Sequence, residues 1–415
     1  MTGNTEKRDE ERKALCVDGS TVSLPPAAAL RLGLAAGARL DVVVRRGRVE
    51  LLPDIHSLSR LYIEPTSKCN LSCRTCIQRT WDEPQGEMVP AVFDRLVKDL
   101  GRFPHLESVM LGGFGEPLVH PDIIRMVSAL KQTGIRAELV SNGTLLDGKM
   151  AEGLLGARLD RLWISFDGAD ELNYESNRQG ARFKQVVENI KPLRGKVELG
   201  IAFVATRANF SDLKNLAWLA KKTGAAYVSV SNVIPYAPEM ERQMVCSLAL
   251  RLGSMSRAPG GPEVDLPRID INDSTRDTLW RLAGGNETLS LMGTPLGAHT
   301  DECRFIRERC SFVRWDGRVA PCMALLHSHV LHLHGAERRN KSHAFGDLAE
   351  RGLAEIWNSK EYSLFREKVS EFNFSPCHVC GGCGLSVDNA KDCGGNVFPE
   401  TCGGCLWAQG IIQCP

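Results

Sequence analysis

The stretch LYIEPTSKCNLSCRTC, residues 61–76, joins a short apolar run to three closely spaced cysteines. The run LYIEPT is typical of a buried strand, and Cys69, Cys73 and Cys76 follow it with three and then two residues between them. A structural zinc site is closed by four ligands, so this loop is one ligand short. Three thiolates can instead hold three corners of a [4Fe–4S] cluster and leave one iron without a protein ligand. The sequence therefore predicts a metal centre with an open position.

Five further strand-like runs follow, at 108–113, 137–142, 161–167, 197–206 and 227–233. Helical patterns lie between them, for example at 90–103, 121–134 and 210–224, and Gly134 and Gly224 end two of these helices. Strand–helix alternation with continuous apolar strands predicts an α/β fold with a parallel sheet. Six units rather than eight predict a partial (β/α)6 TIM-type barrel, open on one side. Active sites of parallel α/β folds form at the carboxyl ends of the strands, which is where the cysteine loop lies.

Composition narrows the classes of function. The net charge is +1, so no global field attracts the chain to nucleic acid or to an anionic membrane. The first sixteen residues, MTGNTEKRDEERKALC, lack the apolar core of a secretory signal, and no run of about 18 apolar residues occurs. We therefore expect a cytoplasmic protein without a membrane span. Disulfides are rare in that compartment, so its 15 cysteines are read first as metal ligands.

The cysteines divide the chain unevenly. Cys16 and Cys246 stand alone and are interpreted as small buried apolar residues. Ten others form a C-terminal set: Cys303, Cys310, Cys322, Cys377, Cys380, Cys383, Cys393, Cys402, Cys405 and Cys414. The segment that carries them looks too irregular for a large apolar core, so we expect metal to hold it together. The predicted domains are 1–56, 57–236, 237–301 as a linker region, and 302–415.

The N-terminal region, Val17–Pro53, reads as a strand, a short helix and two alternating strands around a turn at Arg46-Gly47. This pattern resembles the AbrB/SpoVT-like swapped-hairpin family, whose members are usually DNA-binding dimers. This region contains arginines that could contact phosphate, but acidic residues lie among them and reduce its positive charge. We therefore favour a domain for interaction or dimerisation over a nucleic-acid-binding module. Through this hairpin the protein could form a homodimer.

The three-plus-two cysteine spacing at the mouth of a partial barrel resembles the radical S-adenosylmethionine (radical SAM) family. The resemblance implies that Cys69, Cys73 and Cys76 are catalytic and hold a [4Fe–4S] cluster whose open iron binds S-adenosylmethionine (SAM). The cluster passes one electron to SAM, and the resulting 5′-deoxyadenosyl radical takes a hydrogen atom from the substrate. An electron donor such as ferredoxin or flavodoxin is expected. The residue before the third cysteine is often aromatic in this family but is Thr75 here.

Three later stretches fit the same resemblance, because each ends a predicted strand. GGFGEP at 112–117 follows the second strand, and the family's equivalent loop contacts the amino group of SAM; SNGT at 141–144 ends the third strand, and SFDG at 165–168 ends the fourth. Asp167 in the last could equally close an ordinary turn. The candidate SAM-contact residues are Gly112, Gly113, Gly115, Glu116, Ser141, Asn142, Ser165 and Asp167.

The cysteine-rich tail resembles the SPASM extension of radical SAM enzymes. Cys322 lies five residues after Gly317, and Cys-x2-Cys pairs follow at 377–380 and 402–405. The resemblance implies one or two auxiliary [4Fe–4S] clusters. The interval from Cys310 to Gly317 is shorter than the family pattern, although counting from Cys303 restores it, and the extra cysteines prevent a one-to-one assignment. Taken alone, the pairs would fit a zinc ribbon equally well.

HSHVLHLH, His327 to His334, places four histidines within eight residues. At a period of two, His327 and His329 would share one strand face, as would His332 and His334. Such a set could hold a metal. We favour histidines on an exposed loop.

Stretches such as RTWDEPQG, MLGGFGEPLVHPDI and CGGCLWAQGIIQCP together resemble the radical SAM/SPASM maturases associated with tungsten-cofactor oxidoreductases of the aldehyde ferredoxin oxidoreductase type. The resemblance runs from about 58 to 415 and implies modification of a tungsten oxidoreductase or its cofactor precursor. Two alternatives remain open: a SPASM-type peptide or sulfatase maturase, and a zinc-stabilised DNA-binding regulator.

Overall fold

The computed structural model describes residues 16–18, 21–23, 40–45, 48–245, 263–267, 269, 272–283, 288–291, 294–295, 303–372, 374, 385, 387–392, 394–408 and 410–414. The chain divides into two compact units, Met1–Ser57 and Leu58–Pro415. In the first unit, β1 (Cys16–Asp18) pairs with β2 (Thr21–Ser23), and β3 (Leu40–Arg45) pairs with β4 (Arg48–Pro53), both antiparallel. The predicted hairpin around residues 46–47 is therefore confirmed, and the predicted short helix lies outside the described residues.

The second unit is built on one curved sheet whose centre is parallel. Six strands follow one another in chain order, each paired in parallel with the next: β5 (Arg60–Ile63), β6 (Ser108–Leu111), β7 (Arg136–Ser141), β8 (Arg161–Ser165), β9 (Glu198–Ala205) and β10 (Tyr227–Asn232). These are the six predicted strands. Their central residues are buried on both faces, as all four residues of β6 are, which is why they read as unbroken apolar runs.

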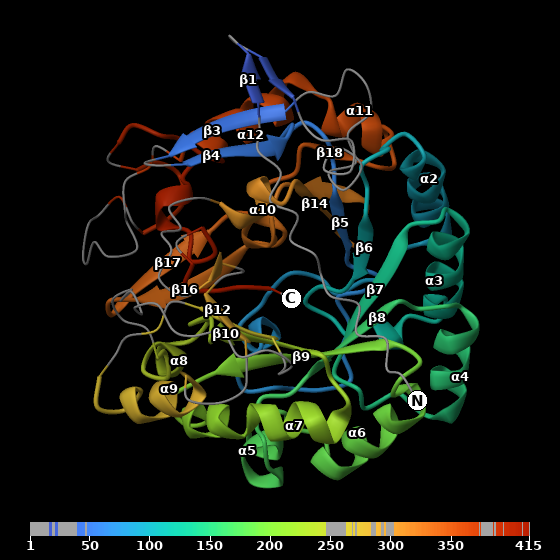
Figure 1. Ribbon diagram of the computed structural model, residues 1–415, viewed down its shortest axis with the longest axis vertical. Coiled ribbons are helices and arrows are strands. Elements are labelled where there is room, and N and C mark those ends of the chain that lie inside the picture. The colour runs from blue at the N-terminus through green and yellow to red at the C-terminus, as the bar shows by residue number, and fades with distance from the viewer. Residues whose placement is uncertain are drawn as a thin grey trace. The chain divides into compact units, whose positions relative to one another are not determined.

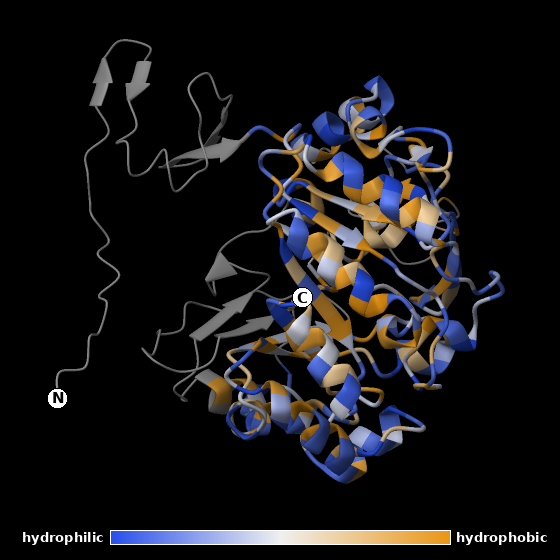
Figure 2. Ribbon diagram, turned by 90° about the vertical axis from the view of Figure 1, so that its right-hand side faces the viewer, coloured by the Kyte–Doolittle hydropathy of each residue, from blue (hydrophilic) through white to orange (hydrophobic). Residues whose placement is uncertain are grey.

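Helices cover the outer face of this sheet. In Figure 1, α2 (Pro90–Leu100), α3 (Ile123–Gln132), α4 (Gly148–Gly156), α6 (Phe183–Ile190) and α7 (Leu216–Thr223) follow one another around the outside of the curve. Gly224 ends α7 with a φ of 78°, a left-handed conformation that glycine adopts without strain. In Figure 2 hydrophobic and hydrophilic residues alternate along the helices, and the buried residues of α2, α3 and α6 are mostly hydrophobic. The core therefore lies between helices and sheet, and the carboxyl ends of the strands are left to form a site.

The predicted linker, 237–301, contributes regular structure instead. It contains α8 (Pro238–Glu241), β11 (Glu263–Leu266), α9 (Arg276–Ala283), β12 (Thr288–Leu291) and β13 (Thr294–Pro295). β11 pairs in parallel with β10, and β12 pairs in parallel with β11, so the sheet continues past the six predicted units. Both strands have only four residues and carry polar side chains, so neither produces the apolar run that marks β5–β10.

The C-terminal segment joins the same sheet at its other edge. β14 (Cys310–Val313) pairs in parallel with β5, and β15 (Arg318–Ala320) and β18 (Gly346–Asp347) extend the sheet outward. A separate hairpin is formed by β16 (His329–Leu333) and β17 (Ala336–Asn340). Three helices complete the segment: α10 (Arg304–Arg307), α11 (Leu353–Trp357) and α12 (Lys360–Glu371).

Apolar packing in this segment is larger than the sequence suggests. Trp357, Tyr362 and Phe365 are almost fully buried, and the ring of Tyr362 stacks on Phe345 with centroids 4.3 Å apart. The Arg366 guanidinium lies over Trp357, 3.8 Å from the ring centroid. The expectation that this segment is too irregular for a large apolar core is therefore wrong. Among the described helices, none combines the length and the apolar character that crossing a membrane requires.

Candidate metal centre and barrel cavity

Cys69, Cys73 and Cys76 lie on the loop that follows β5, and all three are partly exposed. The Cys76 N–H donates to the Cys73 carbonyl at 3.2 Å, and the Gln78 N–H donates to the Cys76 sulfur at 3.5 Å. These bonds turn the chain into a short 3-10 helix at Ile77–Arg79. The loop thus has a defined shape, with three thiols on one short stretch of backbone.

The end of α5 (Glu171–Asn177) and the residues that follow it are hydrogen-bonded to the cysteine loop. The Arg74 N–H donates to the Asn177 carbonyl at 2.9 Å, and the Ser72 N–H donates to the Gln179 carbonyl at 3.3 Å. Backbone contacts of this kind hold the loop without regard to its side chains. The three sulfur atoms therefore remain available as ligands.

The electrostatics of the loop favour neutral thiols until a metal binds. Burial raises the pKa of all three thiols, that of Cys76 to about 11, while the nearby Arg178 guanidinium acts in the opposite direction. Each of Cys73 and Cys76 also feels the charge of its neighbouring cysteines. Because thiolate is the ligand form of cysteine, metal binding here has to displace protons.

The predicted glycine loop lies directly against the cysteine loop. A Cβ on Gly115 would stand 2.1 Å from the Thr66 carbonyl oxygen, and a Cβ on Gly113 would stand 2.6 Å from the Glu64 side chain. Gly112 and Gly113 line a cavity inside the barrel. Glycine is required at Gly113 and Gly115 because the neighbouring chain fills the space that a side chain would need.

Glu116 is buried and ties the second strand's loop to the end of the third strand. Its carboxylate accepts hydrogen bonds from the Ser141 hydroxyl at 2.8 Å, the Asn142 N–H at 2.7 Å and the Leu118 N–H at 3.1 Å. Asn142 in turn donates through Nδ2 to the Asn70 side chain at 2.9 Å, next to the first cysteine. Glu116, Ser141 and Asn142 therefore form one network around the cysteine loop.

Asp167, at the end of the fourth strand, holds a cation that the sequence did not single out. Its carboxylate accepts from the Val204 N–H at 3.0 Å and lies 2.9 Å from Nε of Arg178. Burial would lower the pKa of Arg178, but Asp167 and Cys73 raise it above its ordinary value. Arg178 is thus a positive charge fixed beside the three thiols. Ser165, the fourth-strand residue predicted with Asp167, is half-buried at the end of β8.

The cavity at the carboxyl ends of the strands measures about 220 Å³. One side is barrel, with Thr75 beside the last cysteine, Gly112, Gly113 and Val140. The other side is the C-terminal segment, which enters the curve of the sheet and is red in Figure 1. From it come Trp407, Ile412, Gln413 and Cys414. The chain's last described residues therefore line the same space as the predicted SAM loop.

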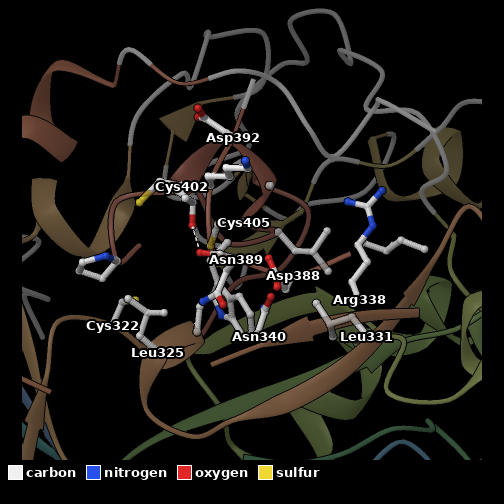
Figure 3. Close-up of a pocket in the computed structure, with 18 of the residues that line it drawn as sticks. Cys322, Leu325, Leu331, Arg338, Asn340, Asp388, Asn389, Asp392, Cys402 and Cys405 are labelled. Atoms are coloured by element: carbon white, nitrogen blue, oxygen red, sulfur yellow. Dashed lines mark hydrogen bonds between the residues drawn. The ribbon is translucent and has the colours of Figure 1, made fainter. Parts of the chain in front are cut away.

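Four of the ten C-terminal cysteines gather in one place: Cys303, Cys322, Cys402 and Cys405. Burial raises the pKa of each thiol, that of Cys303 to about 12, and the charge of Cys405 adds to the rise at the other three. Figure 3 shows Cys322, Cys402 and Cys405 around a second cavity, of about 80 Å³. Four thiols match the ligand set of a [4Fe–4S] cluster.

Throughout the described ranges, no three His, Cys, Asp or Glu side chains converge closely enough to hold a single metal ion. A cubane distributes its ligands over four irons, so it does not require the thiols to meet at one point. The donor set and spacing therefore fit a cluster both at the barrel loop and at the C-terminal group.

Two other predicted ligands lie on other elements. Cys310 is buried within β14, and Cys414 lines the barrel cavity. Cys377, Cys380, Cys383 and Cys393 lie outside the described residues.

The histidine prediction is wrong in its main feature, because His327 and His329 are buried. Strand β16 begins only at His329, and His334 follows it in a turn with a φ of 55°. Both ring nitrogens of His327 lie 2.8 Å from carboxylates, Nε2 from Glu64 and Nδ1 from Glu83. These nitrogens are engaged and do not serve as metal ligands in this arrangement. His327 and His329 do not share one strand face, because His327 lies outside β16.

Comparison with protein families matches the barrel and the C-terminal segment separately. Residues 63–217 match the Radical SAM superfamily, and residues 303–384 match SPASM, an iron–sulfur cluster-binding domain. The tungsten-containing aldehyde ferredoxin oxidoreductase cofactor-modifying protein of Pyrococcus furiosus is 28% identical over 371 residues, 86% of this chain and 96% of that protein. The PqqA peptide cyclase of Gluconobacter oxydans is 25% identical over 339 residues, 78% of this chain and 84% of that protein.

Solved structures support the fold. SuiB of Streptococcus suis bound to S-adenosylmethionine superposes with a TM-score of 0.52 at 16% identity, over 80% of this chain and 72% of that chain. SuiB bound to its precursor peptide SuiA gives a TM-score of 0.53 at 16% identity, over 75% of this chain and 67% of that chain. At this identity the likeness concerns the fold alone.

Proposed function

Because the chain belongs to the radical SAM superfamily and carries a SPASM domain, we propose that it cleaves SAM reductively and uses the resulting radical to modify a tungsten-containing oxidoreductase or its cofactor. The observation that carries the proposal is the set of three thiols beside the cavity at the strand ends. A [4Fe–4S] cluster bound there would supply one electron to SAM at the iron that has no protein ligand. Cys69, Cys73 and Cys76 are the proposed ligands.

The chain's own residues shape the place where SAM binds. Gly112 and Gly113 leave backbone exposed to the cavity, and Glu116 fixes the loop that carries them to Ser141 and Asn142. Because the carboxylate of Glu116 is already occupied by three donors, we assign it a positioning role rather than a direct contact with SAM. Arg178, held by Asp167, is a cation close to the thiols whose remaining N–H groups are proposed to attract the carboxylate of SAM. Ser165 and Asp167 complete the proposed wall on the side of the fourth strand.

Cys303, Cys322, Cys402 and Cys405 are proposed as the ligands of an auxiliary [4Fe–4S] cluster. Cys303 is buried and the other three are half-buried, each close enough to another member of the group to raise that thiol's pKa, and four thiolates leave no iron open. A second auxiliary cluster would draw on Cys377, Cys380, Cys383 or Cys393, with Cys310 and Cys414 as the other candidates. We further propose a cytoplasmic location, a ferredoxin or flavodoxin as electron donor, and dimerisation through the N-terminal hairpin.

The tungsten substrate is supported by the similarity to the Pyrococcus furiosus protein, which extends over most of both chains. A second candidate is peptide maturation, which the similarity to a peptide cyclase favours. The zinc-stabilised regulator is not retained, since the superfamily match identifies an enzyme.

Two experiments test the proposal in order. The protein is purified without oxygen, its iron and zinc are counted, and the reduced protein is assayed for 5′-deoxyadenosine formed from SAM. Cys73→Ala should abolish this product, whereas Ser72→Ala, its neighbour on the same loop, should retain it. Zinc without iron, and no SAM cleavage, would contradict the proposed chemistry.

The substrate is tested by co-expression with a tungsten oxidoreductase. Its mass and activity are compared with wild-type protein, with Cys73→Ala and with neither. A change that requires wild-type protein supports the tungsten assignment. SAM cleavage without any effect on the oxidoreductase, but with a modified precursor peptide, favours the second candidate.

A further inference from the structure

His327 is a fully buried histidine that joins parts of the chain far apart in sequence. Its Nε2 lies 2.8 Å from Oε2 of Glu64, 263 residues earlier, and its Nδ1 lies 2.8 Å from Oε2 of Glu83. Glu64 follows β5, whereas Glu83 lies in the segment after the cysteine loop. The ring of Trp81 meets the imidazole edge-on, with centroids 4.4 Å apart. The imidazole therefore connects the C-terminal segment to the chain on both sides of the cysteine loop, at Glu64 before it and at Glu83 after it.

The imidazole carries a positive charge in this setting. Burial would lower the pKa of His327, but its hydrogen bonds to Glu64 and Glu83 outweigh burial and raise the pKa above its ordinary value. Burial likewise opposes ionisation of Glu83, yet hydrogen bonds from His327 and the Ser328 N–H lower its pKa to about 2. With both ring nitrogens facing carboxylates, the imidazolium is the form that donates at both positions.

Other charged and titratable groups face the same imidazole. Nη1 of Arg314 lies 3.0 Å from Glu83 and 3.5 Å from Nδ1 of His327, and its guanidinium is held by Asp316. His329, the first residue of β16, has its Nδ1 2.9 Å from the His327 carbonyl oxygen. Arg314 opposes the charge on His327, so the two glutamates are what stabilise it.

Glu64 connects this arrangement to the barrel cavity. Its second carboxylate oxygen, Oε1, accepts from the Phe114 N–H at 3.0 Å, and its side chain fills the space beside Gly113. Phe114 also packs edge-on against His327, with centroids 5.6 Å apart. Since Gly112, Gly113 and Phe114 line the cavity, the position of Glu64 sets the position of that wall.

We propose that His327 is a positioning residue for SAM: its imidazolium holds Glu64 against the Gly112–Phe114 loop and thereby sets the affinity of the barrel cavity for SAM. The inference rests on the proposed SAM cleavage at this site. It assigns the histidine to substrate affinity rather than to the bond-breaking step. Loss of the imidazolium should therefore raise the KM for SAM and leave turnover at saturating SAM nearly unchanged.

The first test is His327→Gln, assayed in the full chain as 5′-deoxyadenosine formation with chemical reductant. We expect the KM for SAM to rise at least tenfold, with kcat within threefold of wild type and iron content unchanged. His332→Gln is the matched control, because His332 is a half-exposed histidine in strand β16, which follows His327 in the chain. An unchanged KM in a fully iron-loaded His327→Gln protein would overturn the proposal.

The second test keeps the histidine and changes its charge, so it remains informative if His327→Gln does not fold. Glu83→Gln removes one of the two stabilising carboxylates. In wild type the KM for SAM should stay low at neutral pH and rise where the imidazolium deprotonates; in Glu83→Gln that rise should begin at lower pH. Identical pH profiles for both proteins would contradict the assignment. If wild type itself forms no 5′-deoxyadenosine, the proposed function fails first, so the two failures are distinguishable.

Discussion

At the scale of single residues, Gly115 determines how closely the second strand's loop can approach the metal-binding loop. Its Cα faces backbone, with the carbonyl oxygens of Thr66 and Lys68 within 2.1 and 2.7 Å of where a Cβ would stand. Backbone atoms cannot rotate out of the way as a side chain can. Any side chain at Gly115 must therefore move the start of the cysteine loop.

Gly115→Ala is thus expected to weaken iron binding by the cysteine loop. Iron binding by the C-terminal group of Cys303, Cys322, Cys402 and Cys405 should not change. The variant should lose about four irons per chain, the content of one cubane, while the remaining iron stays bound. Gly156→Ala is the control, because a Cβ at that position, the last residue of α4, meets nothing within 4 Å. Iron analysis after anaerobic purification, together with thermal unfolding, measures both effects; equal iron in the two variants would contradict the expectation.

The buried pair of Asp167 and Arg178 is a second single-residue test. Arg178→Gln leaves a buried carboxylate without its cation, which should lower the free energy of unfolding by about 3–5 kcal/mol. The double variant Asp167→Asn/Arg178→Gln removes both charges and should recover part of that loss. Arg182→Gln, which breaks an exposed pair with Glu175, should leave stability unchanged. Denaturant unfolding compares these three variants with wild type, and a double variant that recovers none of the loss seen in Arg178→Gln would contradict the expectation.

Which site residues the sequence could predict depends on how local their signal is. Cys69, Cys73, Cys76 and the glycines at 112–115 belong to short spacings that can be read directly. Arg178 and His327 carry no such signal. Their partners are Asp167, across a loop, and Glu64, 263 residues away, so only the folded chain brings them together.

At the scale of elements, strands β5–β10 were predictable because each is an apolar run buried on both faces. The strands β11 and β12 were not, since four residues with polar members look like a loop. Residues 353–371 contain two helices rather than one, because Ser359 starts α12 by accepting a hydrogen bond from the Tyr362 N–H at 3.3 Å. Local capping chemistry therefore overrode the longer helical pattern.

The C-terminal segment is the element most open to experiment. Asn232 donates through Nδ2 to the Ile411 carbonyl at 2.6 Å, and the Gln413 side chain donates to the Val230 carbonyl. Ending the chain after Trp407 removes these contacts and one side of the cavity. Iron at the cysteine loop should then be extracted by a chelator several-fold faster than in wild type. Gln413→Ala should show a smaller change in the same direction, and Ser370→Ala, at an exposed position of α12, should show none. Wild-type extraction rates in the truncated protein would exclude a covering role.

At the scale of the whole molecule, the grouping of the cysteines makes a prediction about metal content. Cys402→Ala should lose about four irons while keeping the cluster at Cys69–Cys76, because the two groups are separate. Cys310→Ala should keep full iron, since four other thiols already complete the ligand set of a cubane and Cys310 is a buried residue of β14. Iron counting and electron paramagnetic resonance of the reduced proteins distinguish these outcomes. Equal iron loss from both variants would place Cys310 among the ligands.

The parallel pairing of β14 with β5 also imposes an order on biosynthesis. Val313 pairs with Ile63, about 250 residues earlier in the chain. At roughly 5–20 residues per second, the outer edge of β5 leaves the ribosome roughly 12–50 s before its partner is made. An unpaired edge of this kind invites association with other chains. The edge of β5 is therefore open to pairing with other chains during that interval, and the cysteine loop can be loaded with iron before the last residues enter the barrel.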